Sequence, residues 1–373
     1  MANVRIITFY EKDSKLYTTG VFEYIDTVKF DHIGIFDGIS WQPIPGGGTL
    51  GAANTMQIYN NELYVGGGFI KAGGVSNTAY LASWDGLNWH PVSSGVSNEV
   101  YAFEIYDNKL FVGGAFGMAG GLFCERIAAW DGTNWMNVGS LNTVKDLKVY
   151  NGELYAVGGW TSVKKHTGGT GWVDVGGHSN WYLENMLVDT INNFLFVCGQ
   201  NCIIDDTILC DGVAYYDGFN WHGLLGGTVA VYGGFLRMAI YQGDLYASSS
   251  EDTVDGYIAR WDWDNNRWDS LGSGLNMKAA ALTVYNDELY VGGLFSMAGG
   301  DTAYGLARWY MPTDTTCKYL QPRVLTIADT FYMSQGEAQV QFYNNNAYVQ
   351  TWDWDFGDGN TANIKDPLHT YTE

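Results

Sequence analysis

The side chains that could carry chemistry in this chain are its carboxylates, six histidines and five cysteines, and none has the spacing of a catalytic set. Acyl transfer by an activated serine would need a Gly-x-Ser-x-Gly turn, which the sequence lacks. Paired carboxylates such as Asp205 with Asp206, or Asp353 with Asp355, lie in turn-forming stretches, where they are ordinarily solvated. We therefore expect no catalytic residues and no enzyme activity.

The stretch from Asp262 to Asp269 places oxygen-bearing side chains at alternating positions, as a calcium loop does. It lacks the mid-loop glycine and the closing glutamate of such a loop, and it aligns with hairpin turns elsewhere in the chain. We therefore expect an ordinary hairpin turn here and no metal centre. Structural calcium is the only cofactor that we leave open.

The cysteines have no Cys-x-x-Cys spacing, so they do not form a recognisable metal site. Cys202 and Cys210 flank a short loop and could form a disulfide in an oxidising compartment, with buried free thiols as the alternative. Asn-x-Ser/Thr acceptor sites are absent, which favours a bacterial source.

The charge balance excludes two classes of partner. Forty acidic residues against 19 basic ones give a formal net charge of -21, which repels phosphate backbones and anionic membrane surfaces. No run of 18 or more apolar residues occurs, and the first residues show no apolar signal core. We expect a soluble secreted or cell-surface piece whose leader was removed or left out.

One pattern recurs through most of the chain and must position whatever the side chains do. It reads Glu-Leu-Tyr-Val-Gly-Gly-Gly-Phe at 62–69, and near-copies begin at Lys109, Glu153 and Glu288. The repeated aromatic falls at Tyr17, Tyr64, Phe111, Tyr155, Phe196, Tyr246 and Tyr290, in steps of 47, 47, 44, 41, 50 and 44 residues. A period in this range with strand-like content predicts a repeat architecture.

Each repeat is predicted to form four antiparallel strands, which we call a, b, c and d. In the third repeat they cover 100–106, 109–116, 126–130 and 135–139, with short Asp/Asn or Asp-Gly turns between a and b and between c and d. A sheet of this kind must cover both apolar faces, so copies stack around an axis and thereby protect their edges. Seven copies predict an all-β, seven-bladed β-propeller.

The repeat resembles the kelch motif and, more closely, the repeat Phe-x-x-Ala-Gly-Gly followed by Ala-x-Trp-Asp-Gly-x-x-Trp of secreted and surface propellers of bacteria. Here it runs from Phe69 to Gly74 and from Trp84 to Trp89, and recurs at Phe116 and Phe295. We assign residues 1–320 to this propeller. Blade 7 lacks an evident c-to-d hairpin, so its outer strand is expected from 317–320 or from an upstream segment of a longer parent.

The tail, 321–373, resembles a PKD domain, a small immunoglobulin-like sandwich. The residues that carry the resemblance are Trp352 to Thr361 and Asp366 to Thr372. Family members continue with one more strand after the point where this sequence stops at Glu373. The domain is therefore expected to be incomplete, with the last strand either truncated or lent by a neighbouring molecule.

A kelch-type propeller can also carry the copper-radical chemistry of galactose oxidase, which needs two histidines and two tyrosines at the axis, one tyrosine beside a cysteine. No histidine here is adjacent to a tyrosine in the sequence. His90 and His222 each follow the tryptophan of strand d, so we expect them on the outermost strands, solvated and away from the axis. We therefore expect this chain to have no copper-radical oxidase site.

Loop lengths indicate where a ligand binds. The a-to-b and c-to-d turns are short and share one rim, while the long b-to-c and d-to-a connections share the other, and long loops on a rigid scaffold are where binding usually resides. Trp160 stands where the repeat usually has phenylalanine, and a residue that departs from the repeat is a candidate for binding. A tryptophan at such a position more commonly packs in the core. The candidate ligand-binding residues are Lys71, Met118, Trp160, Lys164 and Met297.

These observations favour a non-catalytic secreted or cell-surface adhesion module that recognises an extracellular glycan or protein through the long-loop rim. One alternative is a structural segment of a large surface adhesin or filament that self-associates through the edge of the PKD-like domain. A second alternative is a fragment of a carbohydrate-active enzyme whose active site lies in other parts of the parent.

Overall fold

The structure is a computed structural model that describes residues 5–25, 28–159, 162–176, 182–199, 202–204, 207–226, 234–249, 256–309, 324–325, 337–344, 354–364 and 367–372. The chain divides into two compact units. The first comprises residues 1–189 and 193–310, and the second comprises 190–192 and 311–373.

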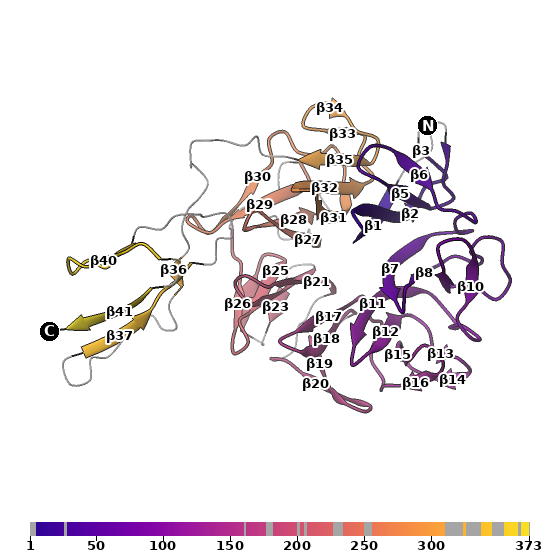
Figure 1. Ribbon diagram of the computed structural model, residues 1–373, viewed down its shortest axis with the longest axis horizontal. Helices are drawn as coiled ribbons and strands as arrows, with labels where there is room; N and C mark the ends of the chain where they lie inside the picture. Colours follow the sequence, from indigo (N-terminus) through magenta and orange to yellow (C-terminus); the bar gives the residue numbers. More distant parts are fainter. Residues whose placement is uncertain are drawn as a thin grey trace. The chain divides into compact units, whose positions relative to one another are not determined.

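Seven antiparallel sheets make up the first unit, and each pairs its strands in chain order apart from small inserted hairpins (Figure 1). Blade 1 consists of β1 (Arg5–Lys12), β2 (Lys15–Val21), β5 (Ile33–Phe36) and β6 (Trp41–Pro43). Blade 2 consists of β7 (Ala53–Tyr59), β8 (Glu62–Gly67), β9 (Leu81–Trp84) and β10 (Trp89–Pro91). Blade 3 consists of β11 (Val100–Tyr106), β12 (Lys109–Gly114), β15 (Ile127–Trp130) and β16 (Trp135–Asn137).

The remaining blades continue the pattern. Blade 4 consists of β17 (Asp146–Tyr150), β18 (Glu153–Val157), β19 (Lys164–Gly168) and β20 (Gly171–Asp174). Blade 5 consists of β21 (Leu183–Asp189), β22 (Phe194–Gly199), β25 (Val213–Tyr216) and β26 (Trp221–Gly223). Blade 6 consists of β27 (Phe235–Tyr241), β28 (Asp244–Ser249), β29 (Ile258–Asp262) and β30 (Arg267–Ser270). Blade 7, within the described residues, consists of β31 (Ala279–Tyr285), β32 (Glu288–Gly293) and β35 (Leu306–Trp309).

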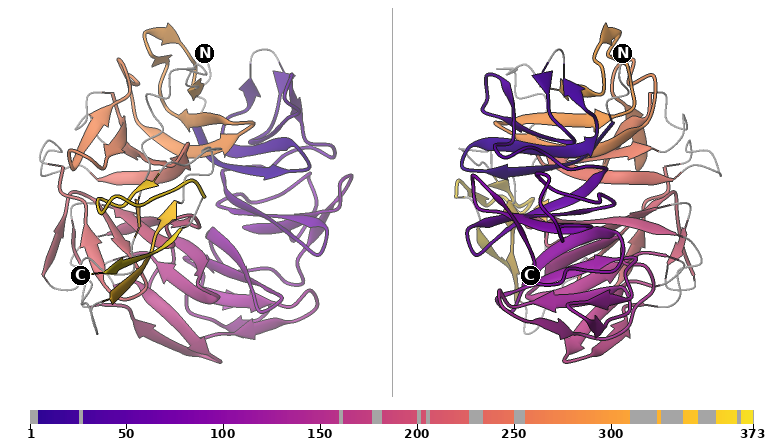
Figure 2. Two further views of the ribbon diagram at one scale, coloured as in Figure 1. Left: turned by 60° about the vertical axis from the view of Figure 1, so that its left-hand side comes forward. Right: turned by 90° about the vertical axis from the view of Figure 1, so that its right-hand side faces the viewer.

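The first strands of the blades surround the axis, since β1, β7, β11, β17, β21, β27 and β31 contact one another in a closed cycle. Two further views show the sheets following one another around this ring (Figure 2). The prediction of an all-β, seven-bladed β-propeller is therefore confirmed for the first unit.

Turn chemistry explains the short hairpins. Asn60 and Asn61, between β7 and β8, both have positive φ angles, of 48° and 65°, as a two-residue turn that follows the strand twist requires. In the c-to-d turns the aspartate caps the chain: Asp85 Oδ1 accepts hydrogen bonds from the backbone N–H groups of Leu87 and Asn88 at 2.8 and 2.7 Å.

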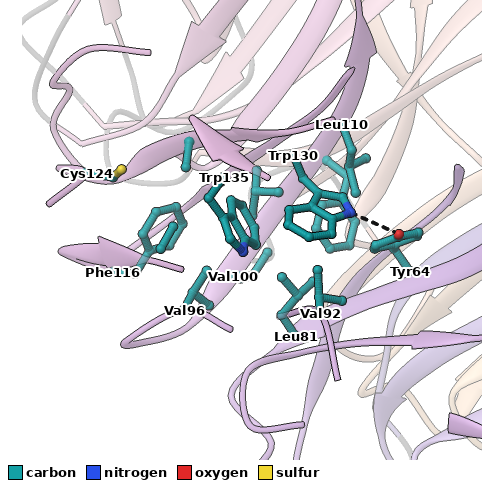
Figure 3. Close-up of a cluster of buried hydrophobic side chains, with 14 of the residues drawn as sticks. Tyr64, Leu81, Val92, Val96, Val100, Leu110, Phe116, Cys124, Trp130 and Trp135 are labelled. Atoms are coloured by element: carbon teal, nitrogen blue, oxygen red, sulfur yellow. Dashed lines mark hydrogen bonds between the residues drawn. The ribbon is translucent and has the colours of Figure 1, made fainter. Parts of the chain in front are cut away.

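The core lies between neighbouring blades and not inside any one sheet. Figure 3 shows such a cluster, in which Trp130 and Trp135 of blade 3 pack beside residues of blade 2. The indole N–H of Trp130 donates to the Tyr64 hydroxyl of blade 2 at 3.2 Å. The tryptophans at one position of strand c are predicted to pack between blades, and Trp84, Trp130 and Trp261 are buried while Trp309 of blade 7 is partly buried.

The Gly-Gly pair at the end of strand b permits this close packing. A Cβ atom on Gly66 would lie 2.5 Å from Val100 Cγ1 of the next blade, and one on Gly67 would lie 2.3 Å from the Ala52 carbonyl oxygen. Even a methyl group therefore does not fit at either position without movement of the neighbouring chain.

The ring closes between blade 7 and blade 1. A Cβ atom on Gly292 would lie 2.6 Å from Ile6 Cγ2, and the Tyr285 hydroxyl donates to the Ser14 carbonyl oxygen at 2.6 Å. The outer strand of blade 7 that the sequence places at 317–320 lies outside the described residues.

Four short hairpins occupy connections that the sequence presents as loops between strands b and c. They are β3–β4 (Tyr24–Ile25, Val28–Lys29), β13–β14 (Met118–Ala119, Leu122–Phe123), β23–β24 (Cys202–Ile204, Ile208–Cys210) and β33–β34 (Met297–Ala298, Asp301–Thr302).

The second unit contains three described strand pairs: β36 (Val324–Leu325) with β38 (Tyr343–Asn344), β37 (Glu337–Gln341) with β41 (Leu368–Thr372), and β39 (Trp354–Asp355) with β40 (Thr361–Ala362). His369 packs flat on Phe356, with ring centroids 4.1 Å apart, and its Nε2 atom lies 2.7 Å from Asp358 Oδ2. The immunoglobulin-like sandwich as a whole stays a prediction.

Candidate functional site

The rim that carries the long connections is here called the long-loop face. Hydrogen bonds join its connections to one another. Asn276 Oδ1, in the connection before blade 7, accepts from the backbone N–H groups of Ser296 and Met297 at 2.9 Å each. Ser97 Oγ plays the same part for Gly117 and Met118 in blade 3, at 3.0 Å each. The long connections are therefore held in a defined arrangement, which a rigid binding surface requires.

A cavity of about 300 Å³ opens on this face between blades 3 and 4; we call it the long-loop cavity. The d-to-a connection from Ser140 to Val144 forms one wall, and Glu125 from the preceding b-to-c connection lies beside it. The opposite wall comes from blade 4, with Gly158 after β18, Lys164 in β19 and Trp172 in β20.

Hydrogen bonds and ion pairs fix the polar walls of the long-loop cavity. The indole N–H of Trp172 donates to the Val138 carbonyl oxygen at 2.8 Å, so the ring has a fixed orientation. Lys164 Nζ lies 2.6 Å from Asp174 Oδ1, and the hydroxyl of Ser140 donates to Glu125 Oε2. The cavity thus offers an indole ring beside a lysine, a hydroxyl and a carboxylate.

The residue that follows the connection from Ser140 to Val144 contacts the innermost strand of blade 3. Lys145, directly after Val144, places its ammonium 4.2 Å from the ring centroid of Tyr101, at the start of β11. The Tyr101 hydroxyl donates to Glu99 Oε2 at 2.8 Å. Burial, together with the Glu99 carboxylate, raises the pKa of Tyr101 to about 12, so this hydroxyl stays protonated at neutral pH.

Charged side chains deeper along the axis join neighbouring blades. Asp146 Oδ2 accepts from Asn185 Nδ2 at 2.6 Å and from the backbone N–H of Met186 at 2.8 Å, and both donors belong to blade 5. Lys148 Nζ lies 3.5 Å from Asp146 Oδ1, and burial raises the pKa of Glu104 nearby. These groups bond to one another and to the backbone, so their evident role is to hold blades 3, 4 and 5 together.

Of the four candidate binding residues that the structure describes, Lys164 lines the long-loop cavity and the other three do not. Lys71, Met118 and Met297 occupy one repeat position on the b-to-c connections of blades 2, 3 and 7, where their side chains are exposed. Trp160 lies outside the described residues. Sequence reasoning missed Glu125, Ser140, Asn142 and Trp172, because only folding brings the connection before blade 4 beside strands β19 and β20.

The histidines expected to be solvated on outer strands do lie there, in β10 and β26, but each has a partner. His90 Nε2 lies 2.9 Å from Asp85 Oδ2, and His222 Nε2 lies 2.8 Å from Asp217 Oδ2. The spacing signals this contact, because each histidine follows its turn aspartate by five positions. Within the described part of the chain, no group of three or more His, Cys, Asp or Glu side chains could hold a metal ion.

The acidic turn in blade 6 uses its oxygens internally. Asp262 Oδ1 accepts from the backbone N–H of Asp264 at 3.0 Å, and Asp262 Oδ2 accepts from Asn265 Nδ2 at 2.8 Å. Cys210 is disulfide-bonded, and the residue opposite it in the β23–β24 pair is Cys202. The bond between these two cysteines stays a prediction. Cys124 and Cys198 are buried free thiols.

Comparison with known proteins identifies no family. No family model matches the chain, and no curated protein matches it. Among solved structures, the computationally designed Ika8 protein is similar, with a TM-score of 0.53, 14% identity, and coverage of 83% of this chain and 97% of that chain. The WD40 β-propeller domain of Doa1 has a TM-score of 0.48 and 12% identity, with coverage of 83% and 93%.

At such identities the likeness to solved structures concerns the fold alone. The class is therefore that of a seven-bladed β-propeller with a small second unit. Because propellers host many unrelated activities, the function must be argued from the surface of this chain. No helix among the described residues has the length and apolar character to cross a membrane.

Proposed function

We propose that this chain is a non-catalytic binding protein that recognises a glycan through its long-loop face. The observation that carries the proposal is the long-loop cavity between blades 3 and 4. At about 300 Å³ it lies at the lower end of the range for small-molecule sites, which suits one or two sugar rings.

The lining favours a sugar over an apolar ligand. The half-buried indole of Trp172 offers a flat apolar surface for the C–H face of a sugar ring. Lys164, Ser140 and Asn142 surround it with donors and acceptors suited to hydroxyl groups. A protein ligand on the same face is the rival, and the experiment below distinguishes the two.

An extracellular bacterial location belongs to this proposal. A disulfide such as the one that Cys210 makes persists in oxidising compartments, and the net charge of -21 favours solubility without membrane contact. The kelch-like character of the repeat and the PKD-like character of 321–373 are part of the same proposal. They rest on the sequence motifs, and similar bacterial surface proteins use PKD domains as spacers.

A glycan array probed with the whole chain tests the proposal, and the best-bound oligosaccharide is then titrated by calorimetry. Because two polar groups leave the cavity wall, the double variant Asn142→Ala with Lys164→Ala should weaken binding by about tenfold or more. The matched control, Asn134→Ala with Lys12→Ala, removes the same residue types from the short-turn rim and should bind as the wild type does.

Two results would contradict the proposal. One is an array on which the wild type binds nothing. The other is equal affinity of the cavity variant and its control. Retention of a protein in a pull-down that the cavity variant loses, with no glycan bound, would decide for the protein rival.

A further inference from the structure

A second cavity, of about 520 Å³, lies on the outer flank where blade 5 meets blade 6; we call it the flank groove. Rings make up much of its lining, including Tyr215 in β25, His222 in β26 and Trp263 in the turn between β29 and β30. Leu225 adds an aliphatic side chain and Asn266 adds a primary amide. The groove is therefore both aromatic and polar.

Three of the other six blades carry ion pairs at the positions that are aromatic in blade 5. The first residue of strand b pairs with a strand c cation in blade 4 (Glu153 with Lys165, 3.1 Å), blade 6 (Asp244 with Arg260, 3.5 Å) and blade 7 (Glu288 with Arg308, 3.0 Å). In blade 5 the same two positions hold Phe194 and Tyr215. Blade 5 thus departs from the repeat, and the fold does not require that departure.

Three rings of blade 5 pack in a row, the first pair tilted by 38° and the second pair stacked. The ring centroids of Phe194 and Tyr215 lie 4.5 Å apart, and those of Tyr215 and His222 lie 4.7 Å apart with an interplanar angle of 16°. Asp217 Oδ2, 2.8 Å from His222 Nε2, holds the imidazole in this orientation. The positions of these rings are therefore fixed before any ligand binds.

The turn of blade 6 completes the groove. Six positions separate Asp262 from Trp268, against four between Asp85 and Trp89 in blade 2. This longer turn contains Trp263, whose ring centroid lies 6.0 Å from that of Tyr215 across the boundary between the blades. Two departures from the repeat, in neighbouring blades, thus meet at one cavity.

We infer that the flank groove binds a sugar ring of a neutral polysaccharide, at a site separate from the long-loop cavity. The indole of Trp263 offers an apolar ring for the C–H face of a hexose, while Asn266 and His222 supply hydrogen-bonding groups for its hydroxyls. The net charge of -21 disfavours a polyanionic polymer. This inference shares the glycan class of the proposed function but does not depend on the long-loop cavity.

Native electrophoresis of the whole chain through gels containing hydroxyethylcellulose, xyloglucan, laminarin or galactomannan tests the inference. At least one polymer should retard the wild type. Trp263→Ala removes one ring of the groove, and Phe194→Glu with Tyr215→Arg installs the ion pair of blade 7. Both variants should weaken the apparent affinity about tenfold or more.

Controls separate loss of binding from loss of folding. The Phe194→Glu, Tyr215→Arg variant should fold, because blade 7 carries that pair at the same positions, and thermal unfolding checks this. Phe219→Ala changes an 88% exposed ring in the c-to-d turn of blade 5 and should leave retardation unchanged. Trp263→Ala should lose the retardation that is due to the flank groove. The Asn142→Ala, Lys164→Ala variant should keep that contribution.

Three outcomes would overturn the inference: no retardation of the wild type in any gel, equal retardation of the wild type and both groove variants, or binding only of an aromatic peptide that Trp263→Ala abolishes. If the groove variants were retarded as strongly as the wild type and the Asn142→Ala, Lys164→Ala variant were not retarded, the flank groove would be rejected. The proposed function would then stand.

Discussion

At the scale of single residues, the aspartates that begin the c-to-d turns serve to build those turns. Asp37, Asp85, Asp131, Asp217 and Asp262 stand at one repeat position, and each accepts backbone N–H groups from the residues two and three places further on. Oxygen atoms committed in this way are poorly placed to act as acids or bases towards a substrate.

The contact between Asp85 and His90 makes stability depend on acid pH. The hydrogen bond from His90, followed by those from two backbone N–H groups, holds the pKa of Asp85 below its ordinary value of 3.8. A lowered carboxyl pKa stabilises the fold above that ordinary value, and this contribution is lost as the pH falls through and below it. Asp85→Asn should therefore lower the Tm at pH 7, by a margin that shrinks towards pH 2 in calorimetry.

Asp264→Asn is the control for this prediction, because Asp264 is exposed in the corresponding turn of blade 6. Its Tm should follow that of the wild type at both pH values. A Tm difference for Asp85→Asn that persisted undiminished in acid would assign the effect to altered turn geometry and not to charge.

At the scale of the strand, the glycine pair decides how closely blades pack, and one substitution isolates this effect. Gly66→Ala places a Cβ atom 2.5 Å from Val100 Cγ1 and 2.8 Å from Phe103 Cζ. Overpacking of this kind costs about 1–3 kcal/mol of unfolding free energy. Urea denaturation measures the loss, and Gly117→Ala, which meets no atom within 4 Å, should change it little.

The sequence predicted strands and blades well because their signals are local and repeated. The bounds expected for strands a and c of blade 3, 100–106 and 126–130, agree with Val100–Tyr106 and Ile127–Trp130 within one residue. The β13–β14 hairpin escaped notice because strands of two residues show no alternation. In the sequence its turn is marked by the pair Gly120 and Gly121, whose φ angles are 59° and 83°.

The cavities were harder to predict because each combines segments that meet only after folding. The long-loop cavity joins the connection from Ser140 to Val144 with strand β19, and of its described lining residues the sequence indicated Lys164. The flank groove did leave a trace in the sequence, since Phe194 and Tyr215 stand where blades 4, 6 and 7 carry charges. Aligning the repeats by side-chain type, and not only by motif, would have exposed that trace.

At the scale of the whole propeller, closure depends on contacts between blades 7 and 1, which are not consecutive in the sequence. The Tyr285 hydroxyl of blade 7 donates to the Ser14 carbonyl oxygen of blade 1 at 2.6 Å. The same bond joins Tyr59 to Asn108 at 2.9 Å between blades 2 and 3, which the d-to-a connection 92–99 also joins. The same tyrosine-to-carbonyl hydrogen bond therefore joins two blades that are consecutive in the sequence and two blades that are not.

This difference predicts unequal effects of two chemically identical substitutions. Tyr285→Phe and Tyr59→Phe should each lower the unfolding free energy by about 1 kcal/mol, because each removes one hydrogen bond. Only Tyr285→Phe weakens the interface that must open for blade 1 to leave the ring. Amide hydrogen exchange in β1 and β2 should therefore accelerate more in Tyr285→Phe than in Tyr59→Phe, and equal acceleration would show that the ring opens at no preferred interface.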